Sequence, residues 1–253
     1  MSELERDSSE DPSCCTRVAI VGRGRLGKAL AGALTASGYE VLGPLGRDAD
    51  GTGADVVLLC VPDDQIAIAA AAIAPGPVVG HCSGATSLEP LSPHESFSLH
   101  PLMTVTHAGA RFAGAGAAID GSTSRALELA GELAGALGTH PVRVRPEDRA
   151  LYHAAASMAS NFLVTLEAAA ERLAGDAGLE RRLLVPLVRA TVENWARLGG
   201  ERSLTGPVAR GDEATVSRQR DAIEQRAPEL LELFDALVLA TRAMAGRSEP
   251  VPA

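Results

Sequence analysis

The sequence predicts an α/β domain with a parallel β-sheet, followed by an all-helical domain. Three observations carry this prediction. Short apolar segments alternate with amphipathic ones up to about residue 145, which is typical of a parallel sheet with helices on both faces. A glycine-rich loop follows the first apolar segment directly. No convincing strand pattern remains beyond Pro146, so the predicted boundaries are 1–12 for an acidic tail, 13–145 for the α/β domain, 146–246 for the helical domain and 247–253 for a flexible end.

The predicted strands are short and apolar. The run over 55–61 (DVVLLCV) has no polar alternation after its first residue, which is typical of a strand buried on both faces. The other strands are expected over 17–21, 40–45, 77–81, 96–100, 117–120 and 141–144. Helices are expected between them over 26–37, 63–74 with Asp63 or Asp64 near the N-cap, and 122–137.

The pattern of the second half of the sequence predicts helices joined by short loops. One long helical pattern covers 147–174, and another covers 179–198 with Pro186 as a kink. A glycine- and proline-containing loop over 203–212 separates these from helices over 212–224 and 228–245.

Composition excludes several functions. Lys and Arg total 23 against 32 Asp and Glu, a net charge of −9, which argues against binding to nucleic acid or an anionic membrane. The tail carries five acidic residues and one basic residue, so we expect it to be disordered and not a signal peptide. No apolar run reaches the roughly 18 residues of a membrane span. The four cysteines lack metal or disulfide spacing, so we expect reduced thiols, a cytoplasmic protein and no metal.

The glycine-rich loop Gly22-Arg23-Gly24-Arg25-Leu26-Gly27 lies between the first strand and the first helix. In that context Gly22 permits the tight turn, Gly24 lets the backbone approach a pyrophosphate, and Gly27 lets the helix pack on the strand. The free N–H groups of the helix N-terminus, around Arg25 and Leu26, then face the phosphates. The loop therefore predicts a dinucleotide site, the alternative being a turn without function.

The tip of the second strand distinguishes NADP from NAD. An NAD site carries an acidic residue there for the ribose 2′-hydroxyl, whereas this chain has Gly46 and Arg47. Arg47, helped by Arg23 or Arg25, can pair with a 2′-phosphate, so we expect NADP rather than NAD. The alternative is a solvated Arg47, with Asp48 serving as the acidic residue.

Ligands of an open α/β sheet lie outside the carboxyl ends of its strands. Val61 and Pro62 follow the third strand and are expected to border the cofactor. His81 and His100 lie at the next two strand tips, where each is either a proton donor or a turn histidine bonded to backbone. Ser83 and Gly84 form a loop that lets substrate or nicotinamide approach, whereas Cys82 is expected to be a small buried filler.

Two further candidates come from the helical half. His153, Ser157, Asn161 and Thr165 recur every four residues and are expected to form one polar line on an apolar helix. This line either contacts substrate, through His153 or Asn161, or is a hydrogen-bonded seam against another helix. In the 203–212 loop, Thr205 and Arg210 are candidates for holding a substrate carboxylate, unless Arg210 merely pairs with Asp212.

Six segments together resemble a known two-domain family. They are GRGRLGKAL, VPDDQI, HCSGA, LHPL, YHAAASMASNFL and LTGPVARGD. The family combines a Rossmann-like domain with a helical domain of unknown function, DUF 2520, and is described as NADP-dependent oxidoreductases. It is distantly similar to ketopantoate reductases, β-hydroxyacid dehydrogenases and pyrroline-5-carboxylate reductases. The resemblance implies a helical domain like the C-terminal domain of 6-phosphogluconate dehydrogenase, and a homodimer.

The chain departs from these distant relatives at one catalytic position. Their long helix carries a catalytic lysine four residues before an asparagine. If Asn161 matches that asparagine, the lysine position holds Ser157. Lys28, on the predicted cofactor-binding helix, is the only lysine in the chain. The proton donor is therefore expected to be His153, His100 or His81, with Tyr152 a further candidate off the polar line.

These observations lead to a functional hypothesis. We expect an NADP-dependent reductase that passes hydride to a small 2-oxo acid similar to ketopantoate, with Ser83, Asn161 and Arg210 holding the substrate. The alternatives are an imine reductase of the pyrroline-5-carboxylate reductase type, an oxidoreductase that uses the deazaflavin F420, and a non-catalytic NADP-binding sensor. The expected partners are a small-molecule substrate and a second copy of the chain.

Overall fold

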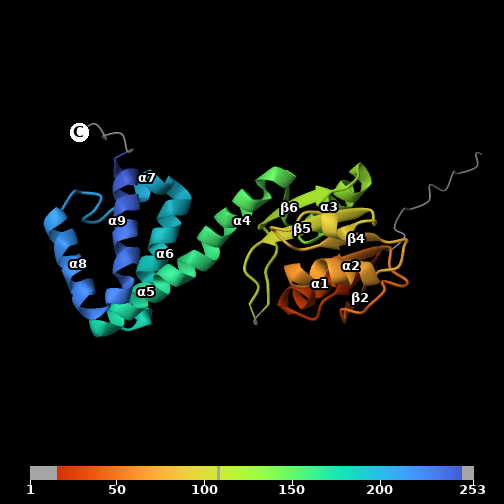
Figure 1. Cartoon of the computed structure of the whole chain (residues 1–253), viewed down its shortest axis with the longest axis horizontal. Coiled ribbons are helices and arrows are strands. Elements are labelled where there is room, and N and C mark those ends of the chain that lie inside the picture. The colour runs from red at the N-terminus through yellow and green to blue at the C-terminus, as the bar shows by residue number, and fades with distance from the viewer. Residues whose placement is uncertain (1–15, 107–108, 247–253) are drawn as a thin grey trace, which may run out of the picture. The chain divides into compact units, whose positions relative to one another are not determined.

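Seven strands form one sheet in the N-terminal part of the chain (Figure 1). The computed structural model describes residues 16–106 and 109–246. Its strands are β1 Arg17–Val21, β2 Glu40–Leu45, β3 Val56–Leu59, β4 Val78–His81, β5 Ser96–Leu102, β6 Gly116–Gly121 and β7 His140–Arg143. Their order in the sheet is β2-β1-β3-β4-β5-β6-β7. The chain divides into two compact units, one up to Ser160 and one from Asn161 onward.

The sheet is parallel from β1 to β5, as the sequence predicts, and then reverses. β6 pairs with β5 antiparallel, with Leu99 opposite Ile119, and β7 runs parallel to β6. A parallel connection needs a crossover, usually a helix, whereas an antiparallel neighbour does not. The described residues between β5 and β6 form no helix. The prediction of a uniformly parallel sheet is therefore wrong at this one pairing.

Helices cover both faces of the sheet, which confirms the predicted α/β layering. Alternate residues of a strand point to opposite faces. Val18 and Ile20 of β1 join one buried cluster with α1 (Arg25–Ala36) and α3 (Ser124–Ala136). Ala19 and Val21 join another with α2 (Ile66–Ala72) and the short turn η2 (Glu89–Leu91). The central strands are thus buried on both sides, as the continuous apolar run over 55–61 indicates, whereas β7 is exposed.

α2 begins later than expected, because Asp63–Gln65 form a separate 3-10 turn, η1. Neither Asp63 nor Asp64 caps α2 with its side chain, so the predicted N-cap is wrong. The carboxylate of Asp63 instead accepts a hydrogen bond of 2.8 Å from the hydroxyl of Ser83. This acidic group therefore orders the loop after β4 rather than the helix.

The long helical pattern over 147–174 is interrupted. A 3-10 turn, η3 (Pro146–Asp148), leads into α4 (Arg149–Ser157), then a π-helical turn, η4 (Met158–Phe162), and α5 (Leu163–Asp176). A π-helix bonds residue i to i+5 rather than i+4. The four-residue spacing of Ser157 and Asn161 therefore does not mark one uninterrupted face. α4 belongs to the first unit, although the sequence assigned it to the helical domain.

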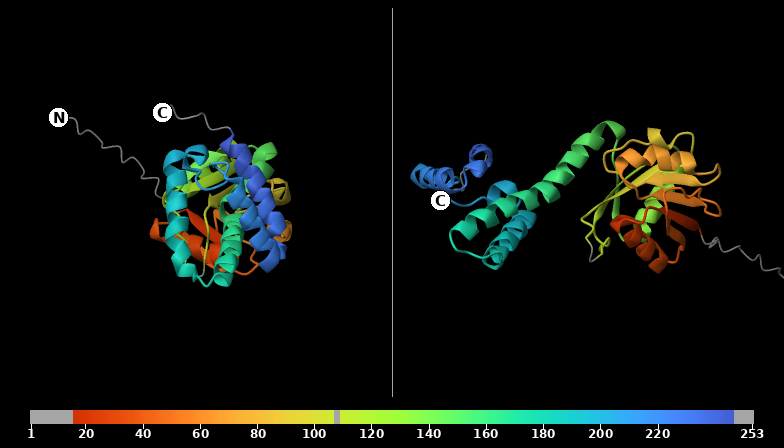
Figure 2. Two further views of the ribbon diagram at one scale, coloured as in Figure 1. Left: turned by 90° about the vertical axis from the view of Figure 1, so that its left-hand side faces the viewer. Right: turned by 60° about the horizontal axis from the view of Figure 1, so that its bottom comes forward.

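The described residues of the second unit form helices joined by turns and loops (Figure 2). After α5 come α6 (Arg181–Leu198, containing Pro186), α7 (Gly200–Ser203), α8 (Glu213–Arg226), the turn η5 (Pro228–Leu230) and α9 (Leu231–Ala245). Asp212 caps α8 by accepting a 3.0 Å hydrogen bond from the Thr215 N–H. None of the described helices combines the length and apolar character needed to cross a membrane.

Many large apolar side chains of this helical unit are exposed. Among the described residues from Asn161 onward, the buried apolar side chains are Val216, Ile223, Ala227 and Val238. Leu183, Leu187 and Trp195 of α6 are exposed, as is Leu239 of α9. The helical unit therefore presents an apolar surface that its own core does not use.

Candidate active site

The glycine-rich loop has the geometry of a phosphate cradle. Gly22 has a φ of 124°, and a Cβ atom there would lie 2.2 Å from the carbonyl oxygen of Cys60. A Cβ atom on Gly27 would lie 2.0 Å from the carbonyl oxygen of Gly22. No described atom lies within 4 Å of the Cβ position of Gly24, the N-cap of α1. The loop is therefore closely packed at Gly22 and Gly27 and open at Gly24, where a ligand can approach.

The first turn of α1 fits an anionic ligand. It contains no acidic residue, and no side chain caps it, so its N–H groups are available to a phosphate. The exposed Arg25 begins this turn, and Leu26 follows it as a half-buried residue. The loop and the helix together match what a dinucleotide pyrophosphate requires.

The tip of β2 is basic. Gly46 and Arg47 follow the strand, and the exposed Arg47 donates a 3.2 Å hydrogen bond to the side-chain oxygen of Gln65. Asp48 is also exposed and comes one residue later. At the neighbouring tip of β3, Val61 packs against the apolar cluster of α2, and Pro62 is exposed. The tip of β2 thus presents the guanidinium of Arg47 at the position where an NAD site presents a carboxylate to the ribose.

His81 is fully buried at the end of β4, and both of its ring nitrogens have partners. Nδ1 accepts a 3.2 Å hydrogen bond from the Ser83 N–H, so Nε2 donates to the Ser87 carbonyl oxygen at 3.0 Å. Burial lowers the pKa of His81, which favours the neutral ring. This geometry matches the turn-histidine alternative and leaves neither nitrogen for a substrate.

The loop after β4 is held by Ser83. Its hydroxyl donates to Asp63 and accepts from the Thr86 N–H at 2.9 Å. At the next residue, a Cβ atom on Gly84 would lie 2.8 Å from the His100 ring and 2.9 Å from the His153 ring. Only glycine lets these two histidines approach the loop so closely.

His100 forms the centre of a polar cluster with α4. Its Nδ1 lies 2.7 Å from the Tyr152 hydroxyl, and its ring centroid lies 6.2 Å from that of His153. Burial, with the adjacent His153 and Arg149, lowers the pKa of His100 to about 4. Burial also raises the pKa of Tyr152. At neutral pH both groups are therefore uncharged and share one hydrogen bond.

The sequence patterns do not identify Arg149 as a member of this cluster, and they give Tyr152 only as a further candidate. Tyr152 lies off the predicted polar line, yet it is the partner of His100. Arg149 attracted no functional prediction, yet its side chain is buried and bonds Ser83 and Ser98. Arg149 and Tyr152 are three residues apart and so share a helix face, which is a signal that the sequence does contain.

The remaining predicted residues are not brought to this cluster by any described contact. Ser157 ends α4, and Asn161 lies in the π-helical turn, where its carbonyl oxygen accepts a 3.1 Å hydrogen bond from the Thr165 hydroxyl. Thr205 and Arg210 are exposed in the second unit. Asp212 caps α8, and its pKa is lowered mainly by the hydrogen bonds with Thr215, with smaller contributions from the charges of Arg218 and Arg210. The proposed substrate contacts of these residues stay predictions.

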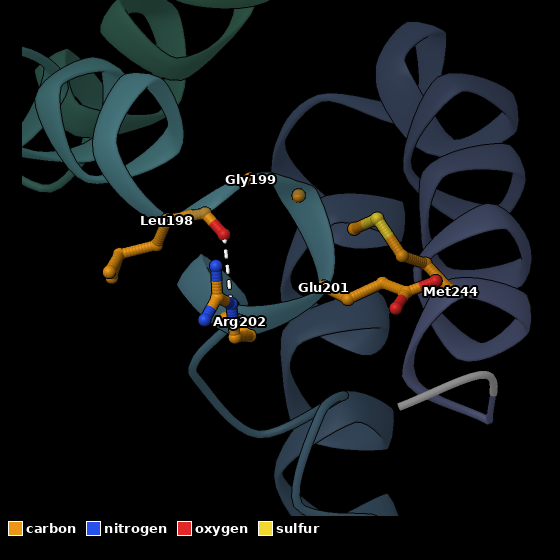
Figure 3. Close-up of a pocket in the computed structure, with 6 residues that line it drawn as sticks. Leu198, Gly199, Glu201, Arg202 and Met244 are labelled. Atoms are coloured by element: carbon orange, nitrogen blue, oxygen red, sulfur yellow. Dashed lines mark hydrogen bonds between the residues drawn. The ribbon is translucent and has the colours of Figure 1, made fainter. Parts of the chain in front are cut away.

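A hollow of about 450 Å³ on the helical unit is a separate feature (Figure 3). It is lined by Leu198, Gly199, Gly200, Glu201, Arg202 and Met244. The guanidinium of Arg202 is already engaged, because its Nε donates a 3.1 Å hydrogen bond to the Leu198 carbonyl oxygen. The lining contains no histidine, cysteine or tyrosine, so we assign no chemistry to it.

Comparison with known proteins agrees with this architecture. The family model described as "Domain of unknown function (DUF2520)" matches residues 115–241. A search of the curated proteins finds no match. The chain is similar to protein TM1727 from Thermotoga maritima, at 26% identity and a TM-score of 0.79, over 90% of this chain and 99% of that one.

Two further solved structures carry functional names. BF3122 from Bacteroides fragilis, provisionally assigned as an NADP oxidoreductase, is 19% identical with a TM-score of 0.78, over 90% of this chain and 98% of its own. A reductive aminase from Aspergillus terreus in complex with NADPH and ethyl-5-oxohexanoate is 14% identical with a TM-score of 0.64, over 91% and 97%. The protein therefore has the fold of NAD(P)-dependent oxidoreductases.

Proposed function

The chain belongs to the DUF2520 family, and we propose that it is an NADP-dependent oxidoreductase that reduces a small 2-oxo acid. The observation that carries this proposal is the neutral His100–Tyr152 pair next to Gly84. Because β1 to β5 run parallel, the glycine-rich loop after β1 and His100, in the last part of β5, lie toward the same ends of the strands. This arrangement supports a cofactor cradle and a proton donor on the same side of the sheet.

The residues of this edge fit NADP. Gly22, Gly24 and Gly27 with the N-terminus of α1 would hold the pyrophosphate. Arg47 and Arg25 would pair with the 2′-phosphate, a contact that NAD does not offer. The bound cofactor supplies the hydride, so the protein has to orient the substrate and provide a proton. The NADPH complex of the reductive aminase, a protein of the same fold, supports this assignment.

The proton comes from His100 in this proposal. When Nδ1 accepts from the Tyr152 hydroxyl, the neutral ring carries its hydrogen on Nε2. As the carbonyl oxygen of the substrate gains negative charge, Nε2 donates its proton to that oxygen, and the Tyr152 hydroxyl donates its own proton to Nδ1. The imidazole stays neutral, and the phenolate left on Tyr152 regains a proton from water. No lysine is required, in agreement with the single, exposed Lys28 on α1.

Imine reduction is the second candidate. The similarity to a reductive aminase favours it, and a protonated imine demands less of the acid than a carbonyl does. The residues that hold the cofactor would be the same. Only the proton path differs, because the substrate nitrogen arrives with its proton.

We also propose that two copies of the chain associate through the helical unit. The exposed apolar side chains of α6, including Leu183, Leu187 and Trp195, support this proposal. A second copy would cover this surface, and sedimentation across a range of concentrations measures whether it does. A monomer at all concentrations would contradict the proposal.

A substrate panel tests the proposed function. We would follow NADPH oxidation with 2-oxo acids that differ in their side chains and, in parallel, with cyclic imines. Turnover of a 2-oxo acid supports the proposal, and faster turnover of an imine supports the second candidate. Tight NADPH binding without turnover of either class would indicate a sensor, and oxidation of reduced F420 alone would indicate that cofactor. Failure to bind NADPH would contradict the proposal as a whole.

Arg47→Ala tests the cofactor preference. We expect the Kd for NADPH to rise about 10-fold, since a charge-assisted contact to the 2′-phosphate is lost, and the Kd for NADH to stay unchanged. Arg17→Ala is the matched control, because Arg17 is an exposed arginine that begins β1, at the opposite edge of the sheet. An equal loss of affinity for both cofactors would show that Arg47 does not contact the 2′-phosphate.

A further inference from the structure

Arg149 is a buried cation that forms no salt bridge within the described part of the chain. It is the first residue of α4 and only 3% exposed. Its Nη2 donates to the Ser83 carbonyl oxygen at 3.3 Å and to the Ser98 hydroxyl at 2.9 Å. In the described part of the chain its Nε and Nη1 are buried without a hydrogen-bond partner. A buried charge with unsatisfied hydrogen-bond donors is costly, so its presence calls for an explanation.

The contacts of Arg149 place it between the parts of the candidate site. Ser83 precedes Gly84, next to which His100 and His153 lie, so one contact fixes that loop. Ser98 precedes His100 by two residues on β5, so both side chains face the same side of the sheet. The second contact therefore ties the start of α4 to the strand that carries His100.

The helical repeat then determines which residues meet. Tyr152 and His153 follow Arg149 by three and four residues, which places them on its face of α4, about one turn further along. Two residues along β5 lead from Ser98 to His100, a step of roughly 6.6 Å. One turn of helix, about 5.4 Å, spans a comparable distance. Anchoring Arg149 on Ser98 thus brings Tyr152 to His100.

The charge of Arg149 acts on the same pair. The ionisable groups that face His100 are Arg149, Tyr152 and His153 from α4, Asp63 from η1 and His81 from β4. The guanidinium lowers the pKa of His100 and that of His81, and it opposes the rise in the pKa of Tyr152. The carboxylate of Asp120, on β6, lies 3.8 Å from Arg143 instead. No salt bridge to Arg149 occurs among the described residues, and Asp120 acts on the guanidinium only from a longer distance, where its charge partly offsets the lowering of the pKa of Arg149 by burial.

We propose that Arg149 is a positioning residue that holds Tyr152 against His100, and that its buried charge stabilises the phenolate formed when Tyr152 releases its proton. The placement stands on the contacts of the protein alone. The role of the phenolate rests on the proposed function. A preorganised charge of this kind stabilises the transition state without having to reorganise as negative charge develops.

Arg149→Met and Arg149→Lys test the placement without any substrate. We would titrate the histidine resonances by NMR, with His100 assigned from a His100→Gln spectrum. The phenol absorbance would report Tyr152, which is distinguished by Tyr152→Phe from Tyr39, the only other tyrosine. In Arg149→Met the pKa of His100 should rise from its value of about 4, with burial and His153 still holding it below that of a free histidine, and the pKa of Tyr152 should rise further. Arg149→Lys keeps the charge and should keep both pKa values near those of the wild type.

Kinetic measurements test the proposed stabilisation of the Tyr152 phenolate by Arg149. Arg149→Met should lower kcat about 10-fold or more with the Kd for NADPH unchanged, and Arg149→Lys should recover part of the loss. Arg145→Met is the matched control, because the exposed Arg145 pairs with Asp148 on the surface and should change neither readout. If Arg149→Met fails to fold, Ser98→Ala removes one anchor and keeps the charge, and kcat should still fall several-fold.

The outcomes separate the two proposals. Unchanged pKa values of His100 and Tyr152 in folded Arg149→Met would overturn the inference, as would an unchanged kcat in Ser98→Ala. Shifted pKa values in a protein that turns over no 2-oxo acid or imine would leave the placement intact and overturn the proposed function.

Discussion

Replacement of His100 by alanine should lower kcat for carbonyl reduction about 100-fold or more, since a positioned general acid contributes rate factors of this order. Tyr152→Phe should lower kcat about 10-fold or more. In this variant His100 still carries the proton that it donates to the substrate, but no hydroxyl is left to return a proton to its ring. The Kd for NADPH, measured by calorimetry, should stay at the wild-type value in both variants. Neither residue belongs to the cradle formed by Gly22, Gly24 and Gly27.

His94→Ala is the control for His100. His94 bonds the backbone carbonyl oxygen of Ala70 at 3.1 Å and precedes β5, whereas His100 lies within that strand and bonds Tyr152. We expect it to retain full activity. A loss confined to His153→Ala, with His100→Ala active, would move the proton donor to His153. Full activity in all of these histidine variants would exclude a histidine acid.

Gly22→Ala is expected to abolish measurable NADPH binding, a loss of at least about 100-fold in Kd. Its Cβ atom would lie 2.2 Å from the Cys60 carbonyl oxygen, at a φ of 124° that an alanine rarely adopts. Strain of this kind costs on the order of 1–3 kcal/mol and displaces the loop that shapes the cradle. Calorimetric titration with NADPH and the Tm of the free protein measure the two effects.

Two alanine variants of the same segment separate binding from stability. Gly24→Ala meets no described atom within 4 Å, so the Tm should be unchanged while the added methyl group weakens NADPH binding at the pyrophosphate. Gly32→Ala lies on the exposed side of α1 and should bind NADPH normally, with stability raised by about 0.5–1 kcal/mol. Normal NADPH binding by Gly22→Ala would show that this loop is not the cofactor site.

The sequence predicts the elements of the sheet well because each strand is a short apolar run with polar residues around it. β2, for example, has the expected bounds of Glu40–Leu45. The direction of β6 was not predicted, because strand direction depends on the connection and leaves no mark on the strand itself. The π-helical turn at Met158–Phe162 was missed for a similar reason, since an i to i+5 pattern has no distinct composition.

The sequence predicts those residues of the candidate site that lie near the carboxyl ends of the parallel strands. Strand tips pointed to His81 and His100, because ligands of parallel sheets lie at that edge. Separating the two required their hydrogen bonds, which engage both nitrogens of His81. Tyr152 and Arg149 could not be assigned from spacing alone, because their partners lie 52 and 51 residues away in the sequence. Such long-range pairings depend on how α4 packs on the sheet.

The position of Trp195 gives the protein an optical probe of one unit. It is the only tryptophan in the chain, lies on α6 and is 61% exposed. Its fluorescence therefore reports the helical unit without a contribution from a tryptophan in the sheet unit. A solvent-exposed tryptophan emits at long wavelength, so a shift of the emission to shorter wavelength as the protein concentration rises would indicate that α6 becomes covered. The same fluorescence follows the unfolding of the helical unit separately from that of the sheet unit.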